Sequence, residues 1–500
     1  MQRDADPTPT ADEWRAAQRQ VQAEWAAHSA GPTPWDGPLG QLIQRAPVAL
    51  PGTAALREAL QTMSAQRIGS VLVLDDAGRL QGIFTRHDVL DRVVLAGRSL
   101  QEPLAAVMSQ PVQTLTPDDT VYEAAALMAR ARIRHVPLVR DGVPVGIVSE
   151  RDLFALQRLS VRHVGETIAA ASTLPQFQHA AAEIRAYARH WMAQGVQPRT
   201  LTALIARLND QLTQRLIDVT LADTDLPADA MAWLALGSEG RGEQTLATDQ
   251  DNALVFDPLG QDVESARARW LAWARRVNEW LDACGYPLCK GGIMAGQAPC
   301  CLTVQEWAAR FARWIDGGSP KELLQASVFF DLRALAGRCD WVEALRADVL
   351  ARTQAAPRFL RQLTQAHLEH AVPLTWWGGI RARRDGAHRW LDVKLQGTAL
   401  LVEGARILAL AHGVAATGTR ERLQRAAAAA RVPQAEIDAW VAAFDYLQTL
   451  RLVRQLQPDA GSEPNRIDVT RLNALEQRML RAALHAIRGL QQRLQLDYLR

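Results

Sequence analysis

Two carboxylates stand one residue apart in the segment 234–256, which reads LALGSEGRGEQTLATDQDNALVF. Asp249 and Asp251 open a short apolar run, 253–256, which is typical of a buried strand. Since side chains alternate along a strand, both aspartates fall on the same side of it. Carboxylates crowded in this way repel each other unless a cation lies between them, and oxygen ligands in this arrangement suit Mg²⁺. The spacing therefore predicts a magnesium site at Asp249 and Asp251.

A Gly-Ser turn precedes the two aspartates, with ten residues between the two motifs. The apolar run 231–236 ends at Gly237 and Ser238. A glycine lets backbone N–H groups approach a polyphosphate closely, and the serine adds a hydroxyl donor. A lone D-x-D is more often part of a loop or a helix cap. The ordered set of strand, Gly-Ser, spacer and D-x-D leading into a second strand is much more specific, and it predicts a site for a metal and a nucleoside triphosphate.

A third carboxylate, Asp331, ends the apolar run 327–330. A carboxylate beside such a run needs a partner or a metal. If Asp331 faces Asp249 and Asp251, the site has the two-metal design, in which one ion lowers the pKa of the attacking hydroxyl and the other stabilises the leaving pyrophosphate. The alternative is an ion pair between Asp331 and nearby Arg333.

An internal repeat occupies the region between residues 54 and 154. Gly82 and Gly146 stand at equivalent places, 64 positions apart, and each copy has the pattern helix, strand, turn, strand, helix. Each second strand ends in Gly-x-x-Thr/Ser-x-x-Asp. An aspartate near a helix start can accept two ribose hydroxyls, and a hydroxyl there can reach a phosphate. The alternative is that these residues are helix caps only; they are Thr85, Asp88, Ser149 and Asp152.

The composition is that of an ordinary globular protein, with 48% hydrophobic and 22% charged residues. Five hundred residues exceed one core and indicate about three or four domains. Because 56 basic residues nearly balance 54 acidic ones, the chain lacks the basic field of nucleic-acid-binding proteins. The sequence has no apolar run of about 18 residues that would span a membrane. Its polar start, MQRDADPTPT, does not resemble a signal peptide.

The five cysteines are an odd number, and none forms the C-x-x-C spacing of a zinc site. A reduced, cytoplasmic setting accounts for them most simply. We therefore expect a cytoplasmic, multidomain protein that binds neither nucleic acid nor a membrane. The cysteines are Cys284, Cys289, Cys300, Cys301 and Cys339.

Helical patterns dominate the region 160–226 and the chain beyond residue 346. The first is typical of a helical linker buried against its neighbours. In the second, three arginines recur on separate helical segments beside apolar stripes. They either lie on solvated helix faces or converge to bind a phosphate or an acidic acceptor. These arginines are Arg406, Arg422 and Arg451.

The order of these motifs resembles the CBS-domain-containing putative nucleotidyltransferases, which are related to the protein-PII uridylyltransferase and belong to the superfamily typified by DNA polymerase beta. The resemblance is carried by GSEGRGEQT at 237–245, TDQDN at 248–252 and GGIMA at 291–295. It is also carried by FFDLR at 329–333 and by a repeat that is similar to a tandem pair of CBS domains. In the C-terminal part it extends to Asp392, Lys394, Arg406, Thr419 and Arg422.

The resemblance implies roles for individual residues. Gly237, Ser238 and Arg241 would contact the triphosphate, and Asp249 and Asp251 would bind two Mg²⁺ ions, with the third carboxylate supplied by a later strand. In the CBS family, the Thr/Ser hydroxyl and the Asp of each copy bind the phosphate and ribose of an adenosine nucleotide such as AMP or ATP. By this resemblance the ligand-binding residues here are Thr85, Asp88, Ser149 and Asp152.

We thus expect an α+β multidomain protein: a tandem CBS pair of α/β type, a polymerase-beta-type nucleotidyltransferase domain with a mixed sheet, and an all-α C-terminal domain. The expected limits are 1–43 for an N-terminal extension, 44–159 for the CBS pair, 160–226 for the linker, 227–345 for the nucleotidyltransferase domain and 346–500 for a helical substrate-binding domain.

The expected activity is Mg²⁺-dependent transfer of a nucleoside monophosphate from an NTP to a hydroxyl of a protein or small molecule, under control of adenine nucleotides bound to the CBS pair. Asp331 would complete the metal site and help to deprotonate the acceptor, for which a PII-like protein is one candidate. CBS pairs tend to dimerise, so a homodimer is expected. The alternative is a non-catalytic nucleotide sensor that acts through partners.

Overall fold

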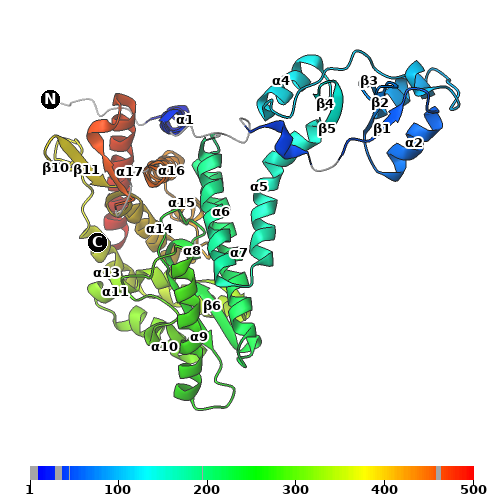
Figure 1. The fold of residues 1–500 in the computed structure, drawn as a ribbon. Helices are drawn as coiled ribbons and strands as arrows, with labels where there is room; N and C mark the ends of the chain where they lie inside the picture. The colour runs from blue at the N-terminus through cyan, green and yellow to red at the C-terminus, as the bar shows by residue number, and fades with distance from the viewer. Residues whose placement is uncertain (1–8, 29–36, 44–45, 194, 458–462, 500) are drawn as a thin grey trace. The chain divides into compact units, whose positions relative to one another are not determined.

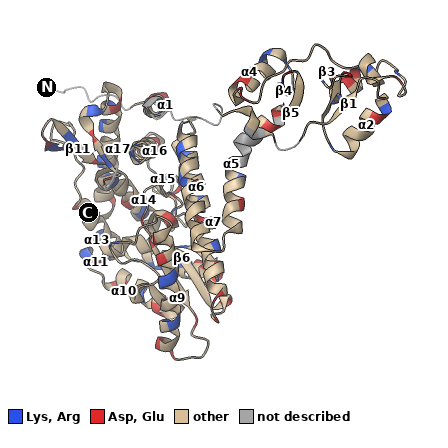
Figure 2. Cartoon of the chain, in the orientation of Figure 1, with Lys and Arg blue, Asp and Glu red and all other residues tan. Residues whose placement is uncertain are grey.

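The structure is a computed structural model that describes residues 9–28, 37–43, 46–193, 195–457 and 463–499 (Figure 1). The chain forms two compact units, one of residues 30–163 and the other of residues 1–29 together with 164–500. Parts of the expected N-terminal extension, including its first eight residues, lie outside the described residues. Acidic and basic residues are interspersed over the helices and strands of both units (Figure 2).

The unit of residues 30–163 contains the sequence repeat as two similar substructures. In the first, β1 pairs with β2 in parallel and β2 pairs with β3 antiparallel. In the second, β4 and β5 form an antiparallel hairpin. Both hairpins shift register at the equivalent place, between Val73 and Leu74 and between Leu138 and Val139. The elements are η1 (Leu39–Leu42), β1 (Ala49–Pro51), α2 (Leu56–Ala65), β2 (Ser70–Leu74), β3 (Leu80–Thr85), α3 (Arg86–Asp88), η2 (Val89–Val94), η3 (Leu104–Ala106), α4 (Val121–Ala131), β4 (His135–Arg140), β5 (Val143–Ser149) and the start of α5 (Glu150–Ala170).

Each substructure of this unit has its own core. The strands of the first copy bury Val71, Val73 and Phe84 against Leu56 and Leu104. In the second copy the equivalent residues Val136, Leu138 and Val148 pack against Val121 and Leu127. The repeat in the sequence is therefore a repeat of apolar positions, because each copy must bury one face of its strands.

The other unit is built on a four-stranded mixed sheet of order β8-β7-β6-β9. The central strand β6 is antiparallel to β7 and β9, and β7 is parallel to β8. All five residues of β6 and all five of β7 are buried, as expected for strands covered on both faces. The strands are β6 (Met231–Ala235), β7 (Asn252–Phe256), β8 (Cys301–Thr303) and β9 (Arg333–Gly337).

Alternation along β6 sends its side chains into two different cores. Trp233 packs in the core that contains Trp270 and Trp273, whereas Leu234 packs in the core that contains Trp307. Helices α6 and α7, which run side by side in Figure 1, and helix α9 cover the first face. The Trp-rich stripes of the sequence are thus core residues. The helices near the sheet are α6 (Leu174–Ala193), α7 (Pro198–Ala222), η4 (Ala228–Ala230), α8 (Gly237–Gly240), α9 (Val263–Ala283), η5 (Ala298–Cys300), α10 (Val304–Gly317), α11 (Pro320–Ala326), η6 (Ser327–Asp331) and α12 (Cys339–Gln354).

The C-terminal part is mainly helical, as predicted, and it also contains a small antiparallel sheet, β10-β11-β12, that the helical patterns do not indicate. Its largest core residues include Trp440, Tyr446 and Phe359. The N-terminal helix α1 (Ala11–His28) packs against α16, with the rings of Trp14 and Tyr446 5.6 Å apart. The elements are α13 (Pro357–Leu368), β10 (Arg383–Asp385), β11 (His388–Asp392), η7 (Lys394–Thr398), α14 (Ala399–Ala411), α15 (Thr419–Ala429), α16 (Gln434–Leu456), β12 (Arg466–Asp468), η8 (Val469–Arg471) and α17 (Ala474–Tyr498).

Candidate active site

The Gly-Ser turn and the aspartate pair lie against each other at one end of the sheet. Strand β6 ends at Ala235, and Gly237 follows with a φ of +51°, a backbone conformation that favours glycine. A Cβ atom at position 237 would lie 2.4 Å from Oδ2 of Asp251. The Leu236 N–H donates to the Asp251 carbonyl at 2.9 Å. The turn is therefore shaped to leave space for this carboxylate.

Replacing Gly237 by Ala is expected to displace Asp251 and to weaken magnesium–nucleotide binding about 100-fold, because misplacing a site group by about 1 Å can cost that much. Gly242→Ala is the matched control. Gly242 also has a positive φ, +65°, but a Cβ there would meet no atom within 4 Å. Isothermal titration calorimetry with a non-hydrolysable NTP should separate the two variants. Equal losses in both would show that backbone strain, and not contact with Asp251, makes Gly237 necessary.

The two aspartates precede β7 directly and differ in exposure. The Asp249 side chain is 47% exposed, and its Oδ1 lies 3.5 Å from Nζ of Lys394, which comes from the C-terminal part of the chain. Asp251 is half-buried. Burial, followed by the nearby charge of Asp249, raises the pKa of Asp251 to about 6. The pair thus carries a crowded negative charge, and Lys394 balances only part of it.

Two hydroxyl groups lie next to the turn. Gln250, the residue between the two aspartates, binds to α9 and the segment that follows it. Ser238 Oγ and Thr248 Oγ1 are 3.1 Å apart. Gln250 is buried and donates to the carbonyls of Asn278 and Tyr286, at 3.0 and 2.8 Å. Gln250 is thus held by α9 and the segment after it, which is consistent with side chains alternating before β7.

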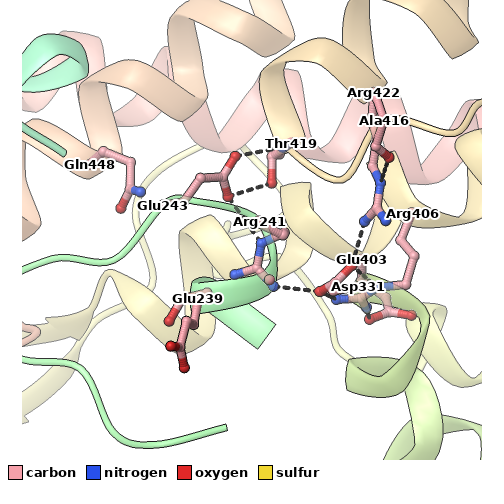
Figure 3. A network of polar contacts seen from close by, with 12 residues as sticks. Glu239, Arg241, Glu243, Asp331, Glu403, Arg406, Ala416, Thr419, Arg422 and Gln448 are labelled. Carbon is pink, nitrogen blue, oxygen red and sulfur yellow. Dashed lines mark hydrogen bonds and ion pairs between the residues drawn. The ribbon is translucent and has the colours of Figure 1, made fainter. Parts of the chain in front are cut away.

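The third predicted ligand, Asp331, has different neighbours from those that a three-carboxylate site requires. It is fully buried at the end of η6, and its carboxylate accepts from Arg241 at 2.6 Å, from Arg406 at 3.0 and 2.6 Å, and from Arg422 (Figure 3). Burial by itself would raise the pKa of Asp331, but the three guanidinium groups hold it far below its usual range.

We therefore correct the assignment of Asp331 as a metal ligand and catalytic residue. Three guanidinium groups already neutralise this carboxylate, which leaves no electrostatic reason for a metal to bind it. Among the described residues, no group of three or more His, Cys, Asp and Glu is arranged to hold a metal ion. The alternative pairing with Arg333 is also wrong, because Arg333 pairs with Asp210 at 2.9 Å.

Arg241 joins the glycine-rich motif to the helical part of the chain. Its Nε donates to Glu243 at 3.0 Å and its Nη1 to Asp331, while Glu243 accepts from the hydroxyl of Thr419 at 2.8 Å (Figure 3). Of the two alternatives for Arg406 and Arg422, solvated helix faces are wrong, because both side chains are buried and converge on the carboxylate of Asp331. The contacts of Arg241 use two of the five N–H donors of its guanidinium, so they leave donors for the predicted contact of Arg241 with a triphosphate.

Glu239 is a carboxylate in the motif that the sequence reasoning missed. It is buried with 6% of its surface exposed, and Figure 3 shows its side chain apart from the Arg241 network. Burial, followed by the charges of Asp210 and Asp251, raises the pKa of Glu239 to about 8. The only signal for it in the sequence is an acid placed directly after a Gly-Ser turn that follows a buried strand.

In the repeat unit, the four predicted ligand-binding residues lie at helix starts and form capping hydrogen bonds there. Thr85 Oγ1 donates to Asp88 at 2.7 Å, and Ser149 Oγ donates to Asp152 at 2.6 Å. The two copies nevertheless differ. Asp88 is buried, with its second oxygen accepting from Ser109 at 2.9 Å, whereas Asp152 is exposed. A ligand could therefore reach Asp152 without displacing a neighbouring side chain.

Three family models together match most of the chain. A model described as "Putative nucleotidyltransferase DUF294" matches residues 182–321, and one described as "Putative nucleotidyltransferase substrate binding domain" matches residues 357–498. The CBS domain model matches twice, at 39–95 and 104–158. The chain belongs to the family of CBS-domain-containing putative nucleotidyltransferases.

Individual relatives match only part of the protein. The uncharacterized protein MK0525 of Methanopyrus kandleri is 32% identical over 130 residues, which are 26% of this chain and 66% of that protein. The CBS domain-containing protein YhcV of Bacillus subtilis is 32% identical over 113 residues, 23% of this chain and 79% of the relative. A solved CBS domain protein of Pyrobaculum aerophilum, complexed with AMP, shares 30% identity over 25% of this chain and 98% of its own, with a TM-score of 0.23.

The residues of the candidate site fall in different family-model matches. The Gly-Ser turn and the aspartate pair lie within the nucleotidyltransferase match, and Lys394, Arg406 and Arg422 lie within the substrate-binding match. Asp331 falls in the segment between the two matches. In the described part of the chain, no helix combines the length and the apolar character needed to cross a membrane.

Proposed function

We propose that this protein is a Mg²⁺-dependent nucleotidyltransferase that transfers a nucleoside monophosphate from an NTP to a hydroxyl group of a protein or small molecule. The observation that carries this proposal is the contact between the turn at Gly237 and the carboxylate of Asp251. A phosphate-binding turn and a pair of carboxylates in contact are the two parts that a metal–triphosphate site needs.

The chemistry of the donor set fits Mg²⁺. Magnesium is usually held by one or two carboxylates, and substrate phosphates and water complete its octahedral shell. Asp249 and Asp251 would supply the carboxylates, and the raised pKa of Asp251 reflects negative charge that a cation would relieve. When bound, the metal would lower the pKa of the attacking hydroxyl and neutralise phosphate charge.

The residues of the chain would orient the substrate. The hydroxyls of Ser238 and Thr248, 3.1 Å apart, would donate to phosphate oxygens. Because Gly237 has no side chain, the phosphates could approach the backbone N–H groups of the turn. Lys394 comes from the substrate-binding match and ion-pairs with Asp249, so that domain contributes directly to the site. The acceptor hydroxyl would lie near this ion pair between Lys394 and Asp249.

Asp331 would not take the proton of the acceptor. A base works best when its pKa lies near the working pH. Three arginines hold the pKa of Asp331 far below its usual range, and Asp249 and Asp251 are assigned to the metal. The bound metal would lower the pKa of the acceptor hydroxyl, whose proton would pass to solvent.

Measuring pyrophosphate release tests the proposed reaction. The protein is incubated with Mg²⁺, each NTP and a candidate acceptor fraction; release with at least one NTP, abolished by EDTA, is expected. A second function, that of a non-catalytic nucleotide sensor, is favoured by one observation, the absence of a third carboxylate ligand among the described residues. Mg²⁺-dependent NTP binding without pyrophosphate release from any NTP would support the sensor and contradict transfer.

We further propose that the CBS unit binds an adenine nucleotide at Ser149 and Asp152, and that CBS pairs from two chains form a homodimer. Asp152→Ala should lower AMP or ATP affinity about tenfold or more, because a carboxylate that accepts ribose hydroxyls contributes a charge-assisted hydrogen bond. Asp119→Ala is the matched control, since Asp119 is a half-buried turn residue in the same unit that also accepts from a backbone N–H and a hydroxyl three residues away, both of Thr116. Calorimetry measures the affinity for AMP and ATP. If both variants bind these nucleotides as tightly as the wild type does, the assignment of Ser149 and Asp152 as ligand-binding residues is wrong.

A further inference from the structure

One of the three predicted arginines, Arg451 on α16, has a different environment from the other two. It is buried with 8% of its surface exposed. Its guanidinium donates to Asn465 at 3.0 Å, to Gln448 at 2.7 Å and to Thr245 at 3.5 Å. All three acceptors are neutral. A guanidinium has five N–H donors, so these contacts leave part of its hydrogen-bonding capacity unused and give its charge no direct ion-pair partner.

Arg406 and Arg422 show that a buried arginine of this protein normally has a carboxylate partner. Those two arginines are also buried, but both bind the carboxylate of Asp331, and Arg406 binds Glu403 as well. For Arg451, in the described part of the chain, no carboxylate lies within ion-pair distance. Taking a cation out of water without an anion is costly, so buried charges are normally paired. Although Arg451 is buried, the described residues therefore give it no anion in direct contact.

The surroundings of Arg451 indicate where that anion would come from. Thr245 belongs to the segment 245–248, which joins the Gly-Ser turn to Asp249, and Thr248 in this segment contacts Ser238. The same segment is held to α16 by the Ala247 N–H, which donates to Gln455 at 3.1 Å. Gln455 in turn donates to Asn465, the acceptor of Arg451. Arg451 is thus held against the segment that carries Thr248, one of the two proposed phosphate-binding hydroxyls.

We propose that Arg451 is the cationic centre of an oxyanion subsite that binds the terminal phosphates of the nucleoside triphosphate. This inference rests on the proposed nucleotidyltransferase function. A phosphate chain whose reacting end lies at the Asp249–Asp251 pair would extend past Ser238 and Thr248 toward Thr245. A guanidinium fork matches phosphate oxygens bidentately, which a lysine cannot do. Burial, followed by the charge of Arg241, lowers the pKa of Arg451 to about 10, and the more distant carboxylates Asp392, Glu243 and Asp249 offset only part of this effect.

Calorimetry can separate this role from a purely structural one. The wild-type chain, Arg451→Gln and Arg451→Lys are titrated in Mg²⁺ with a non-hydrolysable NTP, the corresponding NMP and inorganic tripolyphosphate. If Arg451 binds the terminal phosphates, the Gln variant should lose about tenfold or more in the NTP/NMP affinity ratio while its NMP affinity is kept. The Lys variant, which keeps the charge without the fork, should lie between the two. Arg454→Gln is the control, because Arg454 is one turn along α16 and donates to Gln457.

The outcomes distinguish this subsite from the proposed reaction. Equal loss of NTP and NMP affinity in Arg451→Gln would mean that Arg451 only fixes the segment 245–248, and this would overturn the subsite. An unchanged ratio would overturn it as well. Arg451-dependent binding of tripolyphosphate in a protein that releases no pyrophosphate would keep the subsite and contradict the transferase. If the Gln variant does not fold, the affinity ratio of the Lys variant decides.

Discussion

Asp251→Asn should lower the rate of nucleotidyl transfer by a factor of about 10³ or more, because it removes a charge that holds the metal against the phosphates. Asparagine keeps the size of the side chain, so the contact with Gly237 is preserved. Pyrophosphate release at saturating NTP measures the effect. Asp257→Asn is the matched control, since Asp257 is exposed and follows the opposite end of the same strand, β7. A rate within about threefold of wild type for Asp251→Asn would show that this carboxylate is not part of the catalytic site.

The pH dependence gives an independent check of the same residue. The pKa of Asp251 is raised to about 6, so its carboxyl becomes protonated as the pH falls through that value. Magnesium binding should therefore weaken below about pH 6 and change little above it. The Asn variant has no group to titrate at this position. A wild-type binding profile that does not change between about pH 5 and 7.5 would contradict the assignment.

Asp331→Asn is expected to destabilise the protein by about 3–5 kcal/mol, because it leaves three buried guanidinium groups without their common anion. The carboxylate is fully buried and binds Arg241, Arg406 and Arg422. Urea denaturation, followed through the transition of the unit that contains α14 and α15, measures the loss. Urea is preferred because an ionic denaturant would screen the ion pairs.

Asp340→Asn is the control for this measurement. Asp340 pairs with Arg338 but its side chain is 62% exposed, and surface ion pairs contribute within about 1 kcal/mol. One result would contradict this structural role of Asp331. If Asp331→Asn keeps its stability but loses magnesium-dependent nucleotide binding, Asp331 is a metal ligand, as its position in the sequence suggests, and the arginine network is secondary.

Some features of the site follow from the sequence because they are local. The buried strands that flank the motif are continuous apolar runs, and Gly237 and Asp251 lie at the ends of those runs. Antiparallel pairing of Ala235 with Asn252 then brings the two ends together. The CBS repeat is similarly visible, because each copy repeats its own apolar positions and its own helix cap. In both places, short-range patterns determine which residues lie in contact.

The environment of Asp331 depends on residues far away in the chain, so the sequence could not reveal it. Its partners Arg406 and Arg422 are 75 and 91 residues distant, on helices whose apolar stripes do not show which side chains face η6. The acid beside an apolar run correctly indicates a buried carboxylate that needs a partner. Whether that partner is a metal or a set of arginines depends on how α14 and α15 pack, which no local spacing encodes. Glu239 was missed for the same reason, because its raised pKa comes from burial and from Asp210 and Asp251.

The most direct test of the account is calorimetric titration of the full chain with an NTP that cannot be cleaved between its α- and β-phosphates, with and without Mg²⁺. We expect the wild-type protein to bind this nucleotide only when Mg²⁺ is present, and a variant with both Asp249→Asn and Asp251→Asn not to bind it. Binding of equal affinity with and without Mg²⁺, unchanged in the double variant, would contradict the assignment of this turn and these two carboxylates as the metal–triphosphate site.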